Sequence, residues 1–219
     1  GKDVSTLRQV ATPCMDDHQF LESELVEKGE LSTDSARVVL KALFVARMNR
    51  VDIYWAVNTL AREVTKWTKA CDKRLHRMIS WMHWTVDWVL TAWVGDSASD
   101  CFLALYADAS FAGYLKDSKS STGSVLCLVG PQTFVPITWI CKKQSAVSHS
   151  STEAEVIALD TAVRLDGIPW LSLWEQVSEV LGGSGRATKT RAESEPRRVN
   201  KNKPNTNHTI PLDRTMETL

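Results

Sequence analysis

Two carboxylates carry the chemistry that this sequence offers most clearly. Asp108 interrupts an otherwise apolar stretch, residues 102–113, and Glu155 lies in a segment, residues 151–166, with apolar residues at helical spacing. An acid within so apolar a run is costly to bury unless it is paired or bound to a cation. Two acids brought together by a strand and a helix favour a divalent-metal site for phosphodiester chemistry. The alternative for Asp108 is a surface acid on a half-exposed strand.

The elements that must position these acids follow from hydrophobic periodicity. We predict strands over about 102–110, 122–129 and 134–141, joined by turns at 116–122 and at Gly130-Pro131. These three strands are expected to form an antiparallel meander, with the helix that carries Glu155 packed across it. Residues 151–166 have apolar side chains on two sides, which predicts a helix that packs on the sheet and is also covered from outside. A short helix over 170–181 follows.

Which acids can share a metal depends on their faces. Period two puts Tyr106, Asp108 and Ser110 on one face of their strand. On a helix of about 100° per residue, Glu153 and Glu155 point about 160° apart, so they cannot both reach one metal. We therefore predict that Asp108 faces Glu155 closely enough to share a cation, and that Glu153 is a solvated or capping acid.

The first half of the chain has helical periodicity instead. Residues 1–31 are predicted to be an irregular lead-in and residues 32–95 a helical segment, with helices from about 35, over 52–66 and over 68–86. The turn cluster at 95–100 separates this segment from the β-rich residues 101–181. From Gly182 the sequence is polar and has no aromatic residue, so we expect residues 182–219 to be disordered.

The third predicted helix offers a candidate nucleic-acid surface. Its cations lie within about 60° of one another and its tryptophans are expected to continue that face. The cations are Lys69, Lys73 and Arg77, and the tryptophans are Trp81, Trp84 and Trp88. Cations followed by aromatic rings suit phosphate contact and base stacking. The alternatives are a solvated helix face for the cations and packing on a neighbour for the tryptophans.

Composition excludes several classes of function. Lys plus Arg and Asp plus Glu are both 26, so no global charge indicates nucleic-acid binding. The five cysteines are odd in number and widely spaced, which disfavours zinc and favours a reduced intracellular setting. No apolar run is long enough to span a membrane, and no glycine-rich nucleotide motif indicates a small-molecule cofactor. The first residues are not typical of a signal peptide, and a start without Met fits a piece of a longer polyprotein.

Several motifs in series resemble one known family. They are Asp108-Ala-Ser-Phe-Ala-Gly113, Lys119-Ser-Ser-Thr-Gly123, Ile137-Thr-Trp-Ile-Cys-Lys-Lys-Gln144 and Ser150-Ser-Thr-Glu-Ala-Glu-Val-Ile-Ala-Leu159. Their order and spacing resemble the ribonuclease H domain of copia-type LTR retrotransposon polyproteins. Upstream, Val10-Ala-Thr-Pro13, Lys28-Gly-Glu-Leu31 and Asn49-Arg-Val-Asp-Ile-Tyr-Trp-Ala-Val57 resemble the connection behind reverse transcriptase. The likeness covers roughly residues 10–180.

The resemblance implies a fold and an activity. The fold would be α/β, a helical connection followed by a partial ribonuclease H-like mixed sheet with a packed helix. Asp108 and Glu155 would be catalytic metal ligands for two Mg²⁺ (or Mn²⁺) ions that hydrolyse the RNA strand of RNA:DNA hybrids. The reverse transcriptase part of the polyprotein would be a partner, and the cytoplasmic virus-like particle the location.

The sequence departs from that family at its third and fourth ligands. After Asp166 the chain has one further aspartate, Asp213, in a context unlike either family motif. We therefore expect impaired hydrolysis from a truncated domain. The alternative function is a non-catalytic remnant that binds nucleic acid or a polyprotein neighbour. An integrase core would place its glutamate after two aspartates, and a Ser150–His149–acid triad lacks an oxyanion loop, so both are disfavoured.

Overall fold

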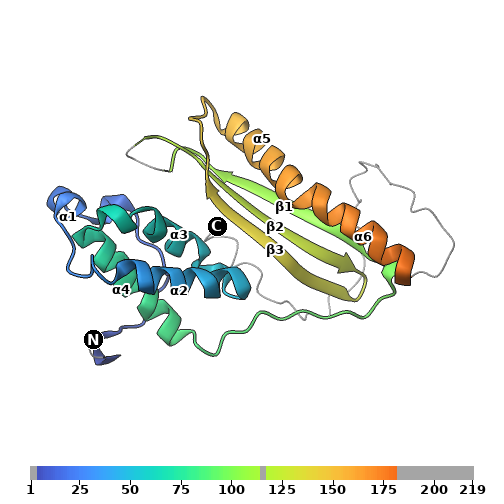
Figure 1. The fold of residues 1–219 in the computed structure, drawn as a ribbon, viewed down its shortest axis with the longest axis horizontal. Coiled ribbons are helices and arrows are strands. Elements are labelled where there is room, and N and C mark those ends of the chain that lie inside the picture. Colours follow the sequence, from blue (N-terminus) through green and yellow to red (C-terminus); the bar gives the residue numbers. More distant parts are fainter. Residues whose placement is uncertain (1–3, 114–116, 182–219) are drawn as a thin grey trace, which may run out of the picture.

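The computed structural model describes residues 4–113 and 117–181 of this 219-residue chain. An all-helical part is followed by a three-stranded sheet with a long helix laid across it, so the fold is α/β (Figure 1). The helices are α1 (Glu22–Val26), α2 (Ser35–Met48), α3 (Tyr54–Arg62), α4 (Lys69–Trp84), α5 (Ser151–Ala162) and α6 (Ile168–Leu181). The strands are β1 (Phe102–Ser110), β2 (Ser121–Gly130) and β3 (Thr133–Lys143).

The core of the helical part lies between α2, α3 and α4. Apolar residues at helical spacing on each of these helices meet in one cluster, because that is how an amphipathic helix removes its apolar stripe from water. Its fully buried members include Val39, Ile53, Val57, Leu60 and Met78. Helices were predicted over these segments, but α4 ends at Trp84, and residues 88–94 form an irregular connection rather than part of a helical segment.

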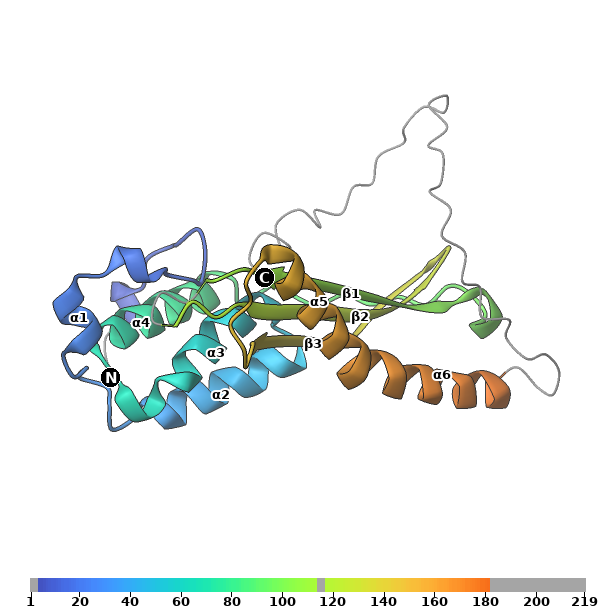
Figure 2. The same cartoon turned by 90° about the horizontal axis from the view of Figure 1, so that it is seen from above.

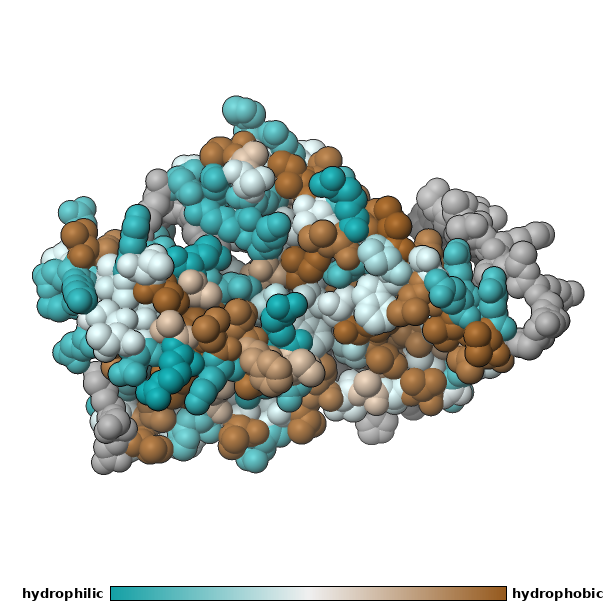
Figure 3. Space-filling view, in the orientation of Figure 1, coloured by the Kyte–Doolittle hydropathy of each residue, from teal (hydrophilic) through white to brown (hydrophobic). Residues whose placement is uncertain are grey.

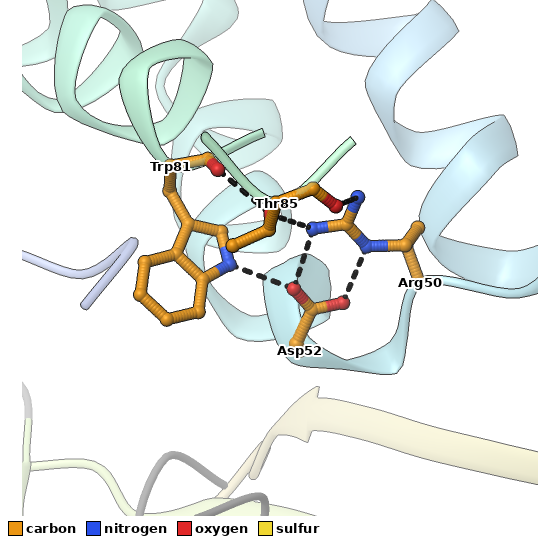
Figure 4. A network of polar contacts seen from close by, with 4 residues as sticks. All are labelled: Arg50, Asp52, Trp81 and Thr85. Carbon is orange, nitrogen blue, oxygen red and sulfur yellow. Dashed lines mark hydrogen bonds and ion pairs between the residues drawn. The ribbon is translucent and has the colours of Figure 1, made fainter. Parts of the chain in front are cut away.

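A buried polar network joins the start of α3 to the end of α4 (Figure 4). Asp52 accepts hydrogen bonds from Arg50 Nε at 2.9 Å and Nη2 at 2.8 Å, and from Trp81 Nε1 at 2.7 Å. Arg50 also donates to the hydroxyl of Thr85 at 2.6 Å and to its carbonyl at 3.2 Å. With these partners the two buried charges are satisfied, which is the condition for keeping charges away from water.

The lead-in folds back along α4. Asp72 of α4 accepts hydrogen bonds from the backbone N–H of Glu30 at 2.6 Å and of Leu31 at 3.2 Å, and from Trp67 Nε1 at 2.7 Å. Gly29, next to Glu30, is buried against the start of α4. A Cβ at this position would lie 2.5 Å from the Thr68 carbonyl oxygen. A side chain is therefore excluded at this position, which explains the glycine of the Lys28–Leu31 motif.

The sheet is an antiparallel meander in the order β1-β2-β3. Its strands match the predicted ranges to within about two residues, since period-two alternation is a local signal. Every strand pair among the described residues is antiparallel, so the predicted meander of these three strands is confirmed; the mixed sheet implied for the larger domain is not seen among them. The register shifts between Leu126 and Cys127, opposite Pro136. Proline lacks an N–H for the ladder, and such residues collect at bulges and edges.

Helices α5 and α6 form one rod across the sheet, linked by a π-helical turn over Val163–Gly167 (Figures 1 and 2). Small side chains at every fourth position, Ala154, Ala158 and Ala162, are fully buried and let the helix approach the strands closely. The opposite stripe, Val156, Leu159 and Val163, remains 38–60% exposed. The predicted outer cover of this helix is thus missing among the described residues, and part of the apolar surface on this side is visible in Figure 3.

Two long-range hydrogen bonds dock the helical part on β3. Trp139 Nε1 donates to the carbonyl of Ala46 in α2 at 3.0 Å, and Asn58 Nδ2 of α3 donates to the carbonyl of Cys141 at 3.0 Å. Trp139 is buried in this contact. The side chain of Trp139 identifies the face of the sheet that the helical part covers, because it reaches from β3 to α2.

Two further predictions concern membrane spans and the C-terminal residues. Within residues 4–113 and 117–181, no helix is both long and apolar enough to cross a membrane. The predicted disorder of 182–219, and with it Asp213, lies outside the described residues.

Candidate active-site carboxylates and the surfaces around them

The strand register fixes the face on which Asp108 lies. Tyr106 is paired with Val125, and Val125 with Trp139, so these three side chains point to the same side of the sheet. Asp108 follows Tyr106 by two residues and shares that side, as period two predicted. It therefore lies on the face from which Trp139 reaches α2, and it is exposed.

Helix α5 covers the other face. Gln144 donates from Nε2 to the hydroxyl of Thr122 at 3.2 Å and to the carbonyl of Ala154 at 3.0 Å, and a Cβ on Gly167 would lie 3.2 Å from Leu105. Thr122 and Leu105 belong to the set of strand positions that alternates with Asp108. The carboxylate of Asp108 thus points away from the helix that carries Glu155. The prediction that these two acids face each other is therefore wrong.

Glu153 has the capping role that was predicted as one of its alternatives. Glu153 caps the helix: its carboxylate accepts the backbone N–H of His149 at 2.7 Å, and its own N–H donates to the Ser150 hydroxyl at 3.1 Å. These contacts assign Glu153 and the Ser150 hydroxyl to capping the start of the helix. Glu155 is exposed on α5.

The described carboxylates do not assemble a complete magnesium site. A two-metal centre needs several carboxylates converging on one place. Within the described residues there is no group of three or more His, Cys, Asp or Glu side chains placed to hold one ion. Asp108 and Glu155, on opposite sides of the sheet plane, therefore do not fit a closed site by themselves.

The predicted nucleic-acid cations contact the lead-in instead. Lys69 pairs with Glu27, Lys73 pairs with Glu24, and Arg77 donates from Nε to the carbonyl of Thr12 at 2.9 Å. The partnership raises the pKa of Lys69 through its hydrogen bond to Glu27, and lowers the pKa of Glu24 through its hydrogen bond to Lys73. These three side chains hold residues 12–27 against α4. Local periodicity does not predict this contact, because the partners are far apart along the chain.

The tryptophans do not form one helical stripe. Trp88 lies beyond the end of α4 and packs edge-to-face on Trp81, with ring centroids 5.3 Å apart. Trp84 donates from Nε1 to the carbonyl of Leu7 at 3.2 Å. The predicted continuation of the cationic face by all three rings is therefore wrong, because the helix ends before the last of them.

Two polar residues at the sheet–helix interface were not singled out from the sequence. Gln144 is buried between β2, β3 and α5, and the only signal was its place at the end of the Ile137–Gln144 motif. Asp166 lies in the π-helical turn, is 8% exposed, and its Oδ2 has no hydrogen-bond partner among the described residues. Burial raises the pKa of Asp166 above its ordinary range.

Two half-buried cysteines, Cys14 and Cys141, do not offer a nucleophile. Burial raises the pKa of Cys14 to about 12 and that of Cys141 to about 11. The thiolate is the reactive form, so both side chains are protonated and inert at neutral pH.

The structure is an α/β fold in which a helical part docks on a βββα unit. One acid lies on the first strand of this unit and another on its helix, as the sequence motifs predicted. The family resemblance is confirmed by similarity to known polyproteins. The chain is 33% identical over 119 residues to the Retrovirus-related Pol polyprotein from transposon RE1 of Arabidopsis thaliana, and 32% identical over 119 residues to the corresponding polyprotein from transposon RE2. Each match covers 54% of this chain.

The matched relatives are far longer than this chain, which spans 8% of their length. No family model matches the sequence, and no solved structure matches it. The similarity thus concerns a piece of a retrotransposon Pol polyprotein.

Proposed function

We propose that this chain is a ribonuclease H-type piece of a retrotransposon Pol polyprotein, formed by the end of the reverse transcriptase connection and the first β-sheet unit of the nuclease domain. The observation that carries the proposal is the order β1-β2-β3-α5, with Asp108 on the first strand and Glu155 on the helix. The similarity to Pol polyproteins supports the same assignment.

The piece on its own is proposed to be non-hydrolytic. Asp108 points to the face opposite α5, and no three His, Cys, Asp or Glu side chains of the described residues are placed to hold one ion. In a complete site of this class, Mg²⁺ or Mn²⁺ would generate hydroxide and stabilise the departing oxygen. The resemblance assigns two of the ligands to Asp108 and Glu155, but here Asp108 points to the face opposite α5, so this piece does not hold the ions in that way. The substrate of the complete domain would be an RNA:DNA hybrid, distinguished by its 2′-hydroxyls.

A cleavage assay tests this proposal. The purified chain is incubated with an end-labelled RNA:DNA hybrid in the presence of Mg²⁺ or Mn²⁺, beside the matched variant Asp108→Asn. We expect no cleavage above that of Asp108→Asn with either ion. Cleavage that is lost in both Asp108→Asn and Glu155→Gln would overturn the non-hydrolytic assignment, and Asp213→Asn would then test whether the remaining aspartate completes the site.

The second candidate function is that of a non-catalytic module that binds nucleic acid or a polyprotein neighbour. The uncovered apolar stripe of α5 favours a protein neighbour, since contiguous exposed apolar surface marks interaction sites. The engagement of Lys69, Lys73 and Arg77 with the lead-in disfavours nucleic acid at α4. Fluorescence anisotropy with a labelled RNA:DNA hybrid separates the two, and we expect no saturable binding that depends on Lys73.

A further inference from the structure

The residues before α2 and the helix α4 carry opposite charges. Residues 7–27, here called the acidic strap, contain five Asp and Glu residues and one Arg, whereas α4 contains four Lys and Arg residues and one Asp. The four cations of α4 lie within about 140° of one another, because the helix turns about 100° per residue. They are Lys69, Lys73, Arg74 and Arg77. The strap thus has the charge needed to cover one cationic face of α4.

The acidic strap runs antiparallel to α4 along the whole length of the helix. Three ion pairs and two hydrogen bonds to backbone carbonyls connect them, and their order along the strap is the reverse of their order along α4. From the C-terminal end of the strap, the pairs are Glu27–Lys69, Glu24–Lys73, Asp17–Arg74, Thr12–Arg77 and Leu7–Trp84. Helix α1, which belongs to the strap, packs beside α4 (Figures 1 and 2). All four cations of α4 therefore contact the strap.

Arg74 is the central attachment of the acidic strap. Its guanidinium pairs with the carboxylate of Asp17 and donates from Nε to the carbonyl of Met15 at 3.2 Å. The same guanidinium lies 4.7 Å from the centroid of the Phe20 ring, a position in which a cation is attracted by the ring face. One side chain of α4 thus holds the strap at three points.

Little apolar surface holds the acidic strap in place. Among the described residues 7–27, Pro13 is the one that is buried. The chain just after the strap is held more firmly, because Glu30 and Leu31 donate their N–H groups to Asp72 and Gly29 packs against the start of α4. Segments with few buried apolar contacts open locally at a low cost in free energy. The strap should therefore open about residues 28–31 while the helical core stays folded.

We infer that the acidic strap is an autoinhibitory cover, which closes the cationic face of α4 to polyanions and is held there by ion pairs, with Arg74 as the main attachment. Opening of the strap exposes four cations on one face, and such an arrangement binds a chain of phosphate or sulfate groups. The closed strap accounts for the expectation that the wild type does not bind through Lys73. The inference does not depend on the nuclease-type assignment, because it uses only the contacts of residues 7–27 with α4.

Cys14 can report whether the strap is closed. Its side chain belongs to the strap and packs partly against the helical core, whereas Cys71 is buried inside α4. The folded full chain is treated with N-ethylmaleimide, and the labelling rate of each cysteine is measured by mass spectrometry after digestion. We expect Arg74→Ala to label at Cys14 about tenfold faster than the wild type, with Cys71 unchanged. Arg37→Ala, which breaks an exposed ion pair of α2, should leave both rates at their wild-type values.

Salt gives a second readout of the same attachment. The screening length falls from about 10 Å at 0.1 M salt to about 3 Å at 1 M, which weakens exposed ion pairs. Added NaCl should therefore accelerate the labelling of Cys14 more in the wild type than in Arg74→Ala. If far-UV circular dichroism shows that Arg74→Ala does not fold, Asp17→Asn removes the same ion pair from the strap side. Labelling of Cys14 that is unchanged in the folded variant, or that rises only together with Cys71, would overturn the inference.

Affinity for immobilised heparin tests whether the strap covers a polyanion site. Two triple variants each neutralise three acids, so both raise the net charge equally. The strap variant is Asp17→Asn/Glu24→Gln/Glu27→Gln, and the control is Asp34→Asn/Asp160→Asn/Glu175→Gln, at exposed positions elsewhere. The strap variant should elute at a higher salt concentration than the control, and adding Lys73→Gln should remove most of that shift, whereas adding Lys41→Gln should not. Equal elution of the two triple variants would show that the strap covers no polyanion site and would overturn the inference.

Discussion

Arg50 and Asp52 form a two-pronged ion pair at the turn into α3, with both side chains about nine-tenths buried. Breaking such a pair leaves one charge uncompensated away from water. We expect Asp52→Asn to lower the free energy of unfolding by about 3–5 kcal/mol, as measured by urea denaturation. The exposed pair Asp34–Arg37 is the control, and Asp34→Asn should cost at most about 1 kcal/mol. Equal effects of the two substitutions would contradict the role of burial.

The docking of the helical part on the sheet should depend on Trp139. Trp139→Phe keeps most of the apolar contact but leaves the buried Ala46 carbonyl without its donor. An unsatisfied buried acceptor costs about 1–3 kcal/mol. The free energy of unfolding, measured by urea denaturation, should therefore fall by about that amount. Trp93→Phe is the matched control, because Trp93 is 41% exposed and pairs through its backbone. A larger loss in the control would reject the assignment.

Asp166 should destabilise the fold at neutral pH. Its folded-state pKa is raised by burial, so the folded chain holds the proton more tightly than the unfolded chain. Stability therefore falls as pH rises from the ordinary aspartate pKa of about 4 through the raised value, and the penalty is complete above it. We expect Asp166→Ala, which extends the alanine stripe of α5, to raise the free energy of unfolding at pH 7.

The gain from Asp166→Ala should shrink as the pH is lowered toward about 4, where the unfolded carboxyl also takes up a proton. Thermal unfolding at a series of pH values measures this. Asp160→Ala serves for comparison, because Asp160 is exposed and pairs with Arg164 on the helix surface. A gain that is independent of pH would assign the effect to helix propensity alone.

The start of α5 should depend on Ser150 and Glu153 but not on Glu155. Ser150→Ala removes the side chain that accepts the Glu153 N–H, and loss of such a cap costs about 1 kcal/mol. Glu155→Gln, an exposed change on the same helix, should shift stability by at most about 0.5 kcal/mol. Chemical denaturation of both variants decides the matter, and a larger effect of Glu155→Gln would mean that Glu155 has a structural partner.

The sequence determined where the helices and strands lie along the chain, but not which of their faces pack together. Period-two alternation placed β1, β2 and β3 within about two residues, and it put Asp108 with Tyr106, because both are properties of neighbouring residues. The separation of Glu153 from Glu155 followed in the same way from helix geometry. The motifs also sufficed to identify the relationship to Pol polyproteins.

The tertiary structure decided which side of the sheet α5 covers. Alternation shows that Asp108 and Leu105 lie on opposite faces, yet either face could have received the helix. Packing of Ala154, Ala158 and Ala162 against the Leu105 side directs Asp108 away from Glu155. Likewise, Lys69 and Lys73 are paired with acids more than forty residues earlier. Contacts over such separations depend on how whole elements pack, which local periodicity does not encode.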